Sequence, residues 1–425
     1  MPDPIIFHVD VNSAFLSWTA SDRMAKGIDK VDLRDLPSAI GGDPKTRHGI
    51  ITAKSIPAKR YGIVTGEPVS QALRKCPSLI LVPGDYSLYA RQSQALMDLL
   101  RKYAPAVDPF SIDEAFCDMT GTASLYGDPV LFAHKLKDEI RRDLGFTVNV
   151  GISSNHLLAK MASDFTKPDR VHTLWPREIP RKMWPLPAAD LLFVGESTAK
   201  KLKSLGILTI GDLAGTPEDL LVSHFGKHGS QMLAYANGTE PSDLTSRHRK
   251  SRGFSNEITI SHDLVDREEA RLILLSLCET LAARIRLQGD KIRLVGVYYK
   301  DSSFVSASRQ TRLNRSSSST QTIYETALSL LHELWDGRPL RLLGVRGSEI
   351  DKDSGSYQMD LFDAGKNRKL DQLDAAVDQI RDKFGDSSIR RAVFLGADET
   401  DLKKRRSNRS RKKPEDPTEP ETPCC

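Results

Sequence analysis

The sequence is poor in cysteine, and its cysteines are not arranged for a disulfide framework or a zinc site. Five cysteines occur among 425 residues, with no CxxC pair and no histidines at the spacing of zinc ligands. We therefore expect a reduced protein of the cytoplasm without structural zinc.

Long apolar segments are also missing. No run of 18 apolar residues occurs, so we expect no membrane span. The start, MPDPIIFHVD, has no basic region followed by a long apolar segment, so we expect no secretory signal. With 39% hydrophobic and 28% charged residues, the composition is that of an ordinary globular chain. The length corresponds to about three domains.

Acidic residues are absent from one window near the end of the chain. The stretch KKRRSNRSRKK at 403–413 holds eight basic residues, so the net charge of +5 is concentrated there and the rest of the chain is net negative. A basic tail fits a polyanionic partner, but it also fits a solvated tail that only promotes solubility. The tail alone does not decide between them.

The first half of the chain contains two strand patterns and a helix pattern. IIFHVDV at 5–11 is an apolar run of strand length, and in an extended strand Ile6, His8 and Asp10 share one face. Asp10 therefore projects from the end of an apolar strand. TVNVGISSN at 147–155 predicts another strand, and NHLLAKMASDF that follows it has helical spacing.

The second half contains a helical hairpin and an internal repeat. Residues 191–214 predict two short helices around a glycine-containing turn. Residues 253–350 then repeat the order strand, helix, strand, with helices over 267–288 and 321–335. The order βαββαβ predicts an antiparallel sheet with helices on one face, and hence an α+β class.

Two adjacent acids stand in an apolar setting in PFSIDEAFCDM at 109–119. Asp113 and Glu114 can converge only at a strand end or a turn, because consecutive strand residues point to opposite faces. Converging carboxylates repel each other unless a cation is present, and Mg²⁺ accepts such ligands together with phosphates. With Asp10 they could hold two metals about 3.5–4 Å apart for phosphoryl transfer. The alternative is a hairpin with one solvated and one salt-bridged carboxylate.

Four motifs give the chain a specific resemblance. FHVDVNSAF (7–15), FSIDEAF (110–116), VGISSNHLLAKMASDFTKPD (150–169) and VGESTAKKLKSLGILTIGDL (194–213) occur in this order. Together they resemble the Y-family DNA polymerases of the DNA polymerase IV type, over about residues 5–395. The combination of SIDEAF with the first-strand aspartate is highly specific.

The resemblance implies a right-hand polymerase with a ferredoxin-like palm, small fingers, a helical thumb and a βαββαβ little-finger domain. The expected boundaries are palm 1–20 and 75–168, fingers 21–74, thumb 169–240, linker 241–251, little finger 252–349, linker 350–366, an amphipathic helix at 367–395 and a disordered basic tail at 396–425.

The implied reaction is template-directed DNA synthesis past lesions. Asp10, Asp113 and Glu114 would hold two Mg²⁺ ions with help from the Val11 carbonyl, and deoxynucleoside triphosphates would be joined to a primer-template with release of pyrophosphate. Glu114 matches the residue usually given the catalytic label. Phe15 would stack under the incoming sugar and exclude a 2′-hydroxyl.

The implied triphosphate contacts depart from the family pattern. Lys167 in TKPD matches a lysine that meets the triphosphate as a point charge. In the fingers, Ile56 and Lys59 stand where relatives commonly have a tyrosine and an arginine, which leaves Ser55, Lys59 and Arg60 as candidates. Asn12 stands where many relatives have a second aspartate.

DNA contacts are implied in two regions. The segment 193–207 resembles a helix-hairpin-helix element, whose backbone N–H groups near Gly195 and Ser197 would meet a phosphate. A plain packing turn is the alternative. The basic domain should track the duplex backbone. Further expected DNA contacts are Lys160, Arg252, Arg309, Arg312 and Arg315.

QMDLF at 358–362 resembles the peptide by which bacterial replication proteins bind the sliding clamp. Leu361 and Phe362 would fill an apolar pocket and Gln358 would add a hydrogen bond. We expect a monomer without membrane contacts. Two rival hypotheses are a non-catalytic DNA- and clamp-binding scaffold, prompted by Ile56 and Asn12, and another two-metal palm enzyme such as a nucleotide cyclase.

Overall fold

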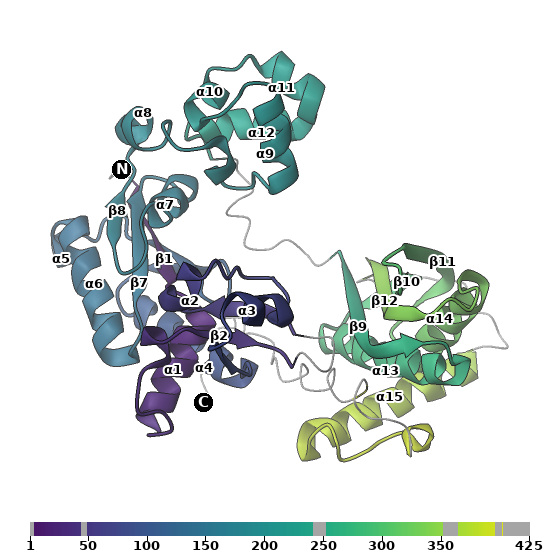
Figure 1. Cartoon of the computed structure of the whole chain (residues 1–425). Helices are drawn as coiled ribbons and strands as arrows, with labels where there is room; N and C mark the ends of the chain where they lie inside the picture. Colours follow the sequence, from purple (N-terminus) through teal and green to yellow (C-terminus); the bar gives the residue numbers. More distant parts are fainter. Residues whose placement is uncertain (1–3, 44–48, 241–251, 352–363, 396–401, 403–425) are drawn as a thin grey trace, which may run out of the picture. The chain divides into compact units, whose positions relative to one another are not determined.

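The structure of the chain is a computed structural model that describes residues 4–43, 49–240, 252–351, 364–395 and 402. It divides into two compact units, Met1–Pro44 with Gly49–Arg249, and Lys45–His48 with Lys250–Cys425 (Figure 1). Both units mix helices with sheets whose strands are mainly antiparallel, and only the pairs β7-β8 and β2-β4 of the first unit are parallel among the described strands, which confirms the predicted α+β class.

A five-stranded sheet forms the centre of the first unit, in the order β5-β6-β1-β7-β8. Its middle strand β1 pairs antiparallel with β6 on one side and β7 on the other, so that Asp10 lies opposite Glu114 and Asn149. All residues of β1 are buried because helices cover both faces of the sheet. The strands are β5 (Ala106–Pro109), β6 (Glu114–Asp118), β1 (Ile6–Val11), β7 (Val148–Ser153) and β8 (Val171–Thr173).

The two faces of β1 pack against different helices. Phe7 and Val9 belong to the core with α1 (Ala14–Ala25), α4 (Tyr86–Arg101) and α6 (Pro129–Leu144). Ile6 packs against Phe116 and against Ala159 of α7 (His156–Ser163) on the opposite face. The predicted common face of Ile6, His8 and Asp10 is therefore confirmed, and it is the face toward α7. A short helix α5 (Ala123–Tyr126) precedes α6.

Gly151 sets the distance between α7 and the sheet. A Cβ atom at this position would collide with the carbonyl oxygen of Ala159 and the backbone nitrogen of Ser163. Only glycine lets strand and helix backbones approach this closely. The close packing brings the side chains of α7 over the end of β1.

A second, smaller sheet has the order β3-β2-β4 and lies within residues 38–82. Its core includes Ile51, Ala58 and Val69, from the sheet and its two helices. The elements are η1 (Leu33–Asp35), β2 (Ser38–Gly41), β3 (Ile51–Lys54), α2 (Ile56–Arg60), α3 (Val69–Lys75) and β4 (Ile80–Val82).

Residues 176–236 are helical. The predicted hairpin of two short helices consists of α9 (Glu196–Ser204) and α10 (Ile210–Ala214), and α10 begins with a capping box between Thr209 and Asp212. Leu202, Ile210, Leu221 and Met232 belong to the core of this region. The other elements are η3 (Pro176–Glu178), α8 (Ile179–Lys182), η4 (Ala188–Asp190), α11 (Glu218–Phe225) and α12 (Lys227–Ala236).

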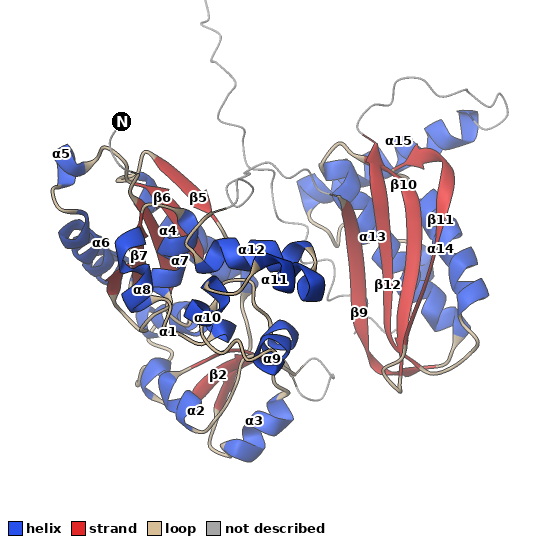
Figure 2. Ribbon diagram, turned by 90° about the horizontal axis from the view of Figure 1, so that it is seen from above, coloured by secondary structure: helices blue, strands red, loops and turns tan. Residues whose placement is uncertain are grey.

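The second unit has the predicted βαββαβ order. Its antiparallel sheet runs β11-β10-β12-β9, and α13 and α14 cover one face of it (Figure 2). Leu274 and Leu281 of α13 pack with Ile258, Val297 and other inward residues of the strands. The elements are β9 (Gly253–Leu264), α13 (Arg267–Leu287), β10 (Lys291–Asp301), β11 (Ser306–Ser317), α14 (Thr320–Leu334) and β12 (Leu340–Asp351).

The last long helix, α15 (Ala364–Phe384), is shorter than the expected helix over 367–395, and Gly385 with φ 91° follows its end. The helix belongs to the second unit and is joined to it by ion pairs. Arg286 of α13 pairs with Asp378 at 2.7 Å and with Asp374 at 3.3 Å. The short helix η5 (Ala392–Phe394) adds Phe394, which is buried against Leu275.

No helix in the described ranges is both long and apolar enough to cross a membrane. Cys76, Cys117 and Cys278 are buried and carry free thiols.

We predict that Gly151→Ala destabilises the first unit by about 3 kcal/mol or more, because the added methyl group forces strand and helix backbones apart. Chemical unfolding followed by circular dichroism measures this change. Gly195→Ala is the matched control, since a Cβ there meets nothing within 4 Å. Equal stability of the two variants would contradict the close-packing account.

Candidate active site

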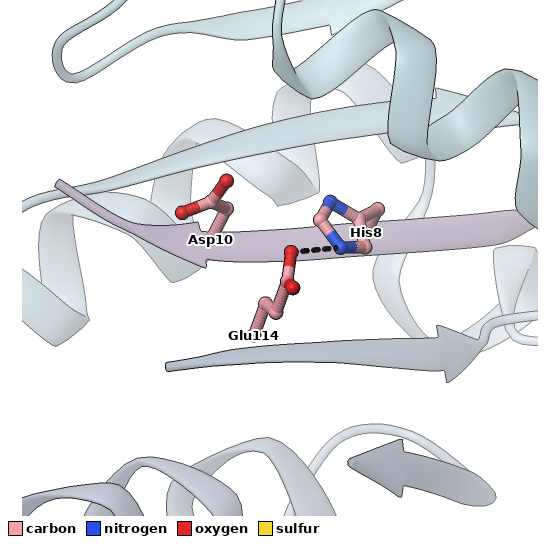
Figure 3. A group of neighbouring side chains, drawn as sticks. All are labelled: His8, Asp10 and Glu114. Atoms are coloured by element: carbon pink, nitrogen blue, oxygen red, sulfur yellow. Dashed lines mark ion pairs between the residues drawn. The ribbon is translucent and has the colours of Figure 1, made fainter. Parts of the chain in front are cut away.

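Three carboxylates meet at one end of the central sheet. Asp10 lies near the end of β1, Glu114 begins β6 directly opposite it, and Asp113 precedes Glu114 in the turn between β5 and β6. The backbone N–H of Val11 donates to the Asp113 carbonyl at 3.0 Å, which ties this turn to β1. Figure 3 shows the carboxylates of Asp10 and Glu114 projecting from neighbouring strands on the same side. The structure thus brings Asp10 and Glu114 together at a strand end, and Asp113 lies beside them in the turn before β6.

The carboxylates have unlike electrostatic surroundings. Burial raises the pKa of Asp113, and the nearby Asp10 and Glu114 add to this, against an opposing hydrogen bond from Ser111. Burial also acts to raise the pKa of Glu114, but contacts with His8 and Lys160 outweigh it and lower the pKa to about 2. Burial therefore favours the neutral form of Asp113, whereas the groups around Glu114 favour its charged form.

Two lysines supply positive charge to the cluster. The Lys160 ammonium forms an ion pair with Glu114 and lies 3.8 Å from Asp10. The Lys167 ammonium donates to Asp10 Oδ2 at 2.6 Å and pairs with Asp164 at 2.8 Å. The sequence predicted Lys160 as a DNA contact, whereas in the structure its ammonium is engaged by the carboxylates.

His8 is a site residue that the sequence reasoning missed. Its fully buried ring lies beside Phe116 with ring centroids 4.7 Å apart, and its Nε2 is 3.2 Å from Glu114 Oε2 (Figure 3). The contact is not aligned as a hydrogen bond, and Nε2 has no other hydrogen-bond partner among the described residues. Burial lowers the pKa of His8. The signal in the sequence was its shared strand face with Asp10.

The cluster fits a divalent cation. Donor atoms of His8, Asp10 and Glu114 all lie within 4.8 Å of one another. Carboxylate oxygens are the donors that Mg²⁺ and similar hard ions prefer, and an added cation would offset the repulsion between neighbouring carboxylates.

A pocket of about 600 Å³ adjoins the carboxylates. Phe15 forms part of its wall and is held by Tyr89 of α4, whose ring is stacked on it at 4.4 Å between centroids and 6° between planes. The volume is within the range of small-molecule sites. Its lining residues include Asp10, Val11, Asn12, Phe15, Arg34, Thr52, Lys54, Ser55, Ile56, Lys59, Asp113 and Lys167.

The residues predicted to contact the triphosphate differ in whether they line the pocket and whether their side chains already have other partners. Lys59 and Lys167 line the pocket with charged groups. Ser55 also lines it, but its hydroxyl donates to the Leu36 carbonyl and caps α2 by accepting from the Ala58 N–H. Arg60 is exposed on α2 and is not among the lining residues. Arg34 and Lys54 are lining cations that the sequence reasoning did not select.

Asn12 has a structural role at the rim of the pocket. Its side-chain oxygen accepts from Thr147 Oγ1 at 3.0 Å and from the backbone N–H of Asp169 at 2.9 Å, while its Nδ2 donates to Asn149 Oδ1 at 3.2 Å. An aspartate could make the first two bonds but not the third. The departure from the family pattern therefore coincides with a buried amide network.

The predicted DNA contacts are placed as follows. Gly195 and Ser197 are exposed at the start of α9, whose N-terminus has no side-chain cap. Arg252 is exposed just before β9.

The three arginines of β11 do not form one surface. Arg309 pairs with Glu333 of α14, on the helix-covered side of the sheet, and Arg312 pairs with Glu349 of β12 at 2.8 Å. Arg315 is half-buried. Arg346, which the sequence reasoning missed, donates to Gln310, two positions from Arg312 on the same face of β11.

The predicted clamp peptide, with Gln358, Leu361 and Phe362, lies outside the described residues, as does the basic window at 403–413.

The fold and the site together define a right-hand nucleic-acid polymerase, and comparisons with known proteins specify the family. The sequence matches the impB/mucB/samB family over residues 9–164 and the C-terminal domain of that family over residues 251–361. It is 44% identical to DNA polymerase IV of Clostridium acetobutylicum over 93% of this chain and 99% of the relative. It is 34% identical to DNA polymerase IV of Acetivibrio thermocellus over 92% of this chain and 97% of the relative.

A solved Y-family DNA polymerase chimera has the same fold, with a TM-score of 0.68 and 23% identity over 82% of this chain and 100% of the chimera. The chain therefore belongs to the impB/mucB/samB family, the Y family of DNA-directed DNA polymerases, and within it to the DNA polymerase IV type. The family is metal-dependent, in agreement with the carboxylate cluster.

We predict that Asn12→Asp destabilises the protein by about 1–3 kcal/mol, because Asn149 Oδ1 loses a donor and faces an anion instead. Thermal unfolding in the presence of EDTA measures the change without bound metal. Asn314→Asp at an exposed position of β11 is the control and should change little. An Asn12 variant as stable as this control would remove the structural explanation for Asn12.

Proposed function

We propose that the chain is a template-directed DNA polymerase that performs translesion synthesis, joining a deoxynucleotide to a primer 3′-hydroxyl with two Mg²⁺ ions. The observation that carries the proposal is that Asp10 and Asp113 line a nucleotide-sized pocket, while Glu114 lies directly opposite Asp10 on the neighbouring strand. Family membership supports the same activity.

Different residues of the chain would bind the metals and the triphosphate. Asp10, Asp113 and Glu114, with the Val11 carbonyl, would hold the metals. When bound, two Mg²⁺ ions lower the pKa of the primer hydroxyl and stabilise the leaving pyrophosphate. Lys167 and Lys59, as lining cations, bind the triphosphate charge. These residues bind and orient the substrates, which lowers the entropic cost of the reaction.

Phe15 selects the sugar. Its ring is fixed against Tyr89, so it cannot turn aside for a bulkier substrate. A ribonucleotide would bring its 2′-hydroxyl against this ring and is excluded by the lack of space.

DNA is held by backbone contacts without sequence preference. The uncapped start of α9, near Gly195 and Ser197, offers N–H groups to a phosphate. Arg252 is exposed and supplies positive charge in the second unit. Arg309 and Arg312 are exposed but paired with Glu333 and Glu349, so they contribute less. Arg315 and Lys160 also have other partners in the structure.

The peptide at 358–362 binds the bacterial sliding clamp through Leu361, Phe362 and Gln358. The support is its sequence, QMDLF, and its position after the last strand of the second unit. We further propose that the protein acts as a monomer in the cytoplasm.

We predict that Asp113→Ala and Glu114→Ala each reduce primer extension at least about 1,000-fold while DNA binding persists, because the metals lose their ligands. Single-nucleotide extension with Mg²⁺ and a gel-shift assay measure the two properties. Asp118→Ala, at the far end of β6, is the control and should remain active. A wild type that binds primer-template but extends nothing would instead support a DNA-binding scaffold.

We predict that Phe15→Ala admits ribonucleotides, raising their kcat/KM relative to deoxynucleotides by about 100-fold or more, since the excluding ring is gone. Steady-state extension with matched dNTP and rNTP pairs checks this. Phe110→Ala provides a comparison, since this exposed phenylalanine is not among the residues lining the pocket. Unchanged discrimination in Phe15→Ala would assign sugar selection to another group.

A further inference from the structure

Lys160 is held in the cluster by its backbone as well as by its charge. The Ser163 hydroxyl donates to the Lys160 carbonyl at 2.8 Å, and His8 Nδ1 lies 2.8 Å from Ser163 Oγ. Because the proton of Ser163 is committed to Lys160, His8 Nδ1 must be the donor to Ser163. This chain of bonds, together with the close approach at Gly151, fixes the position of Lys160 on α7.

The paired strands create a demand for positive charge next to Glu114. Asp10 lies directly opposite Glu114, and His8 Nε2 is 3.2 Å from Glu114 Oε2 without a hydrogen bond between them. Two carboxylates placed in this way repel each other unless a cation lies beside them. The Lys160 ammonium, with a side chain only 12% exposed, provides that cation on Glu114.

A second position for this ammonium exists within reach. Asp164, four residues further along the helix, has a carboxylate oxygen 3.8 Å from Lys160 Nζ, and its side chain is 46% exposed. The other oxygen of Asp164 pairs with Lys167 at 2.8 Å, so the Lys160 ammonium can move from Glu114 and Asp10 only toward the oxygen that Lys167 does not hold.

We propose that Lys160 is a positioning residue that acts as a built-in counterion for the metal ligands. It holds Glu114 and Asp10 together before metal binds, and it moves to Asp164 when a divalent cation takes its place. The inference rests on the proposed metal-dependent function, and it makes metal binding a competition between the ion and an ammonium group of the chain.

The test is Mn²⁺ binding by the full chain without DNA or nucleotide, measured from the electron paramagnetic resonance signal of free Mn²⁺. Lys160→Met removes the competing charge, so Mn²⁺ should bind about tenfold more tightly than to the wild type. Lys160→Arg keeps a cation and should bind Mn²⁺ about as the wild type does. Thermal unfolding in EDTA checks that each variant is folded, and Lys160→Gln replaces the Met variant if that variant is not.

The matched control is Lys137→Met. The Lys137 side chain is 9% exposed and forms ion pairs at 2.9 Å with Asp138 and Asp169, none of which belongs to the carboxylate cluster. This variant should bind Mn²⁺ as the wild type does.

A double-mutant cycle tests the second position of the ammonium. Asp164→Asn should weaken Mn²⁺ binding several-fold more in the presence of Lys160 than in the Lys160→Met background. Equal effects in the two backgrounds would show that Asp164 does not receive the ammonium.

Two outcomes overturn the proposal in distinguishable ways. If the wild type binds Mn²⁺ and Lys160→Met binds it equally or more weakly, Lys160 is not a competing counterion and the proposed function is untouched. If the wild type binds no Mn²⁺ even with primer-template and a deoxynucleotide, the proposed function and this inference both fail.

Discussion

Repulsion among carboxylates is the constraint on which this structure's chemistry depends. The pairing of β1 with β6 brings Asp10 opposite Glu114, and the turn before β6 adds Asp113. Such a cluster is stable only if cations compensate it, and Lys160 and Lys167 supply part of that compensation. A site that attracts divalent ions suits the transfer of a nucleotidyl group from a highly charged triphosphate, with pyrophosphate as the leaving group.

Contacts elsewhere in the first unit position the residues that surround the carboxylates. Gly151 allows α7 to lie directly on the sheet, which delivers Lys160 to Glu114. The bonds of Asn12 to Thr147 and Asn149 hold the end of β1 against β7 where the pocket begins. Packing also shapes the pocket wall, because the ring of Phe15 is held in position by its stack with Tyr89.

Periodic patterns were sufficient for much of the fold. The alternation of side chains along a strand correctly placed His8 and Asp10 on one face of β1. The repeat after residue 252 predicted the βαββαβ unit, with the end of α13 within one residue of its observed position. The same period could have shown that Arg309 and Arg312 occupy opposite faces of β11. The end of the last helix was placed too late because Gly385 follows Phe384 directly, a stop signal that the apolar spacing does not contain.

What the sequence could not reveal are contacts between distant residues. His8, Glu114 and Ser163 are separated by more than 40 residues each, so no local pattern relates them, and their contacts arise only when α7 packs on β1. Lys160 was expected to contact DNA, whereas burial against two carboxylates gives it another partner. The most direct test of the account is the anomalous diffraction of Mn²⁺ in crystals of the protein with primer-template and a non-hydrolysable deoxynucleotide. The account predicts manganese bound to the carboxylates of Asp10, Asp113 and Glu114, and manganese found only at other positions would contradict it.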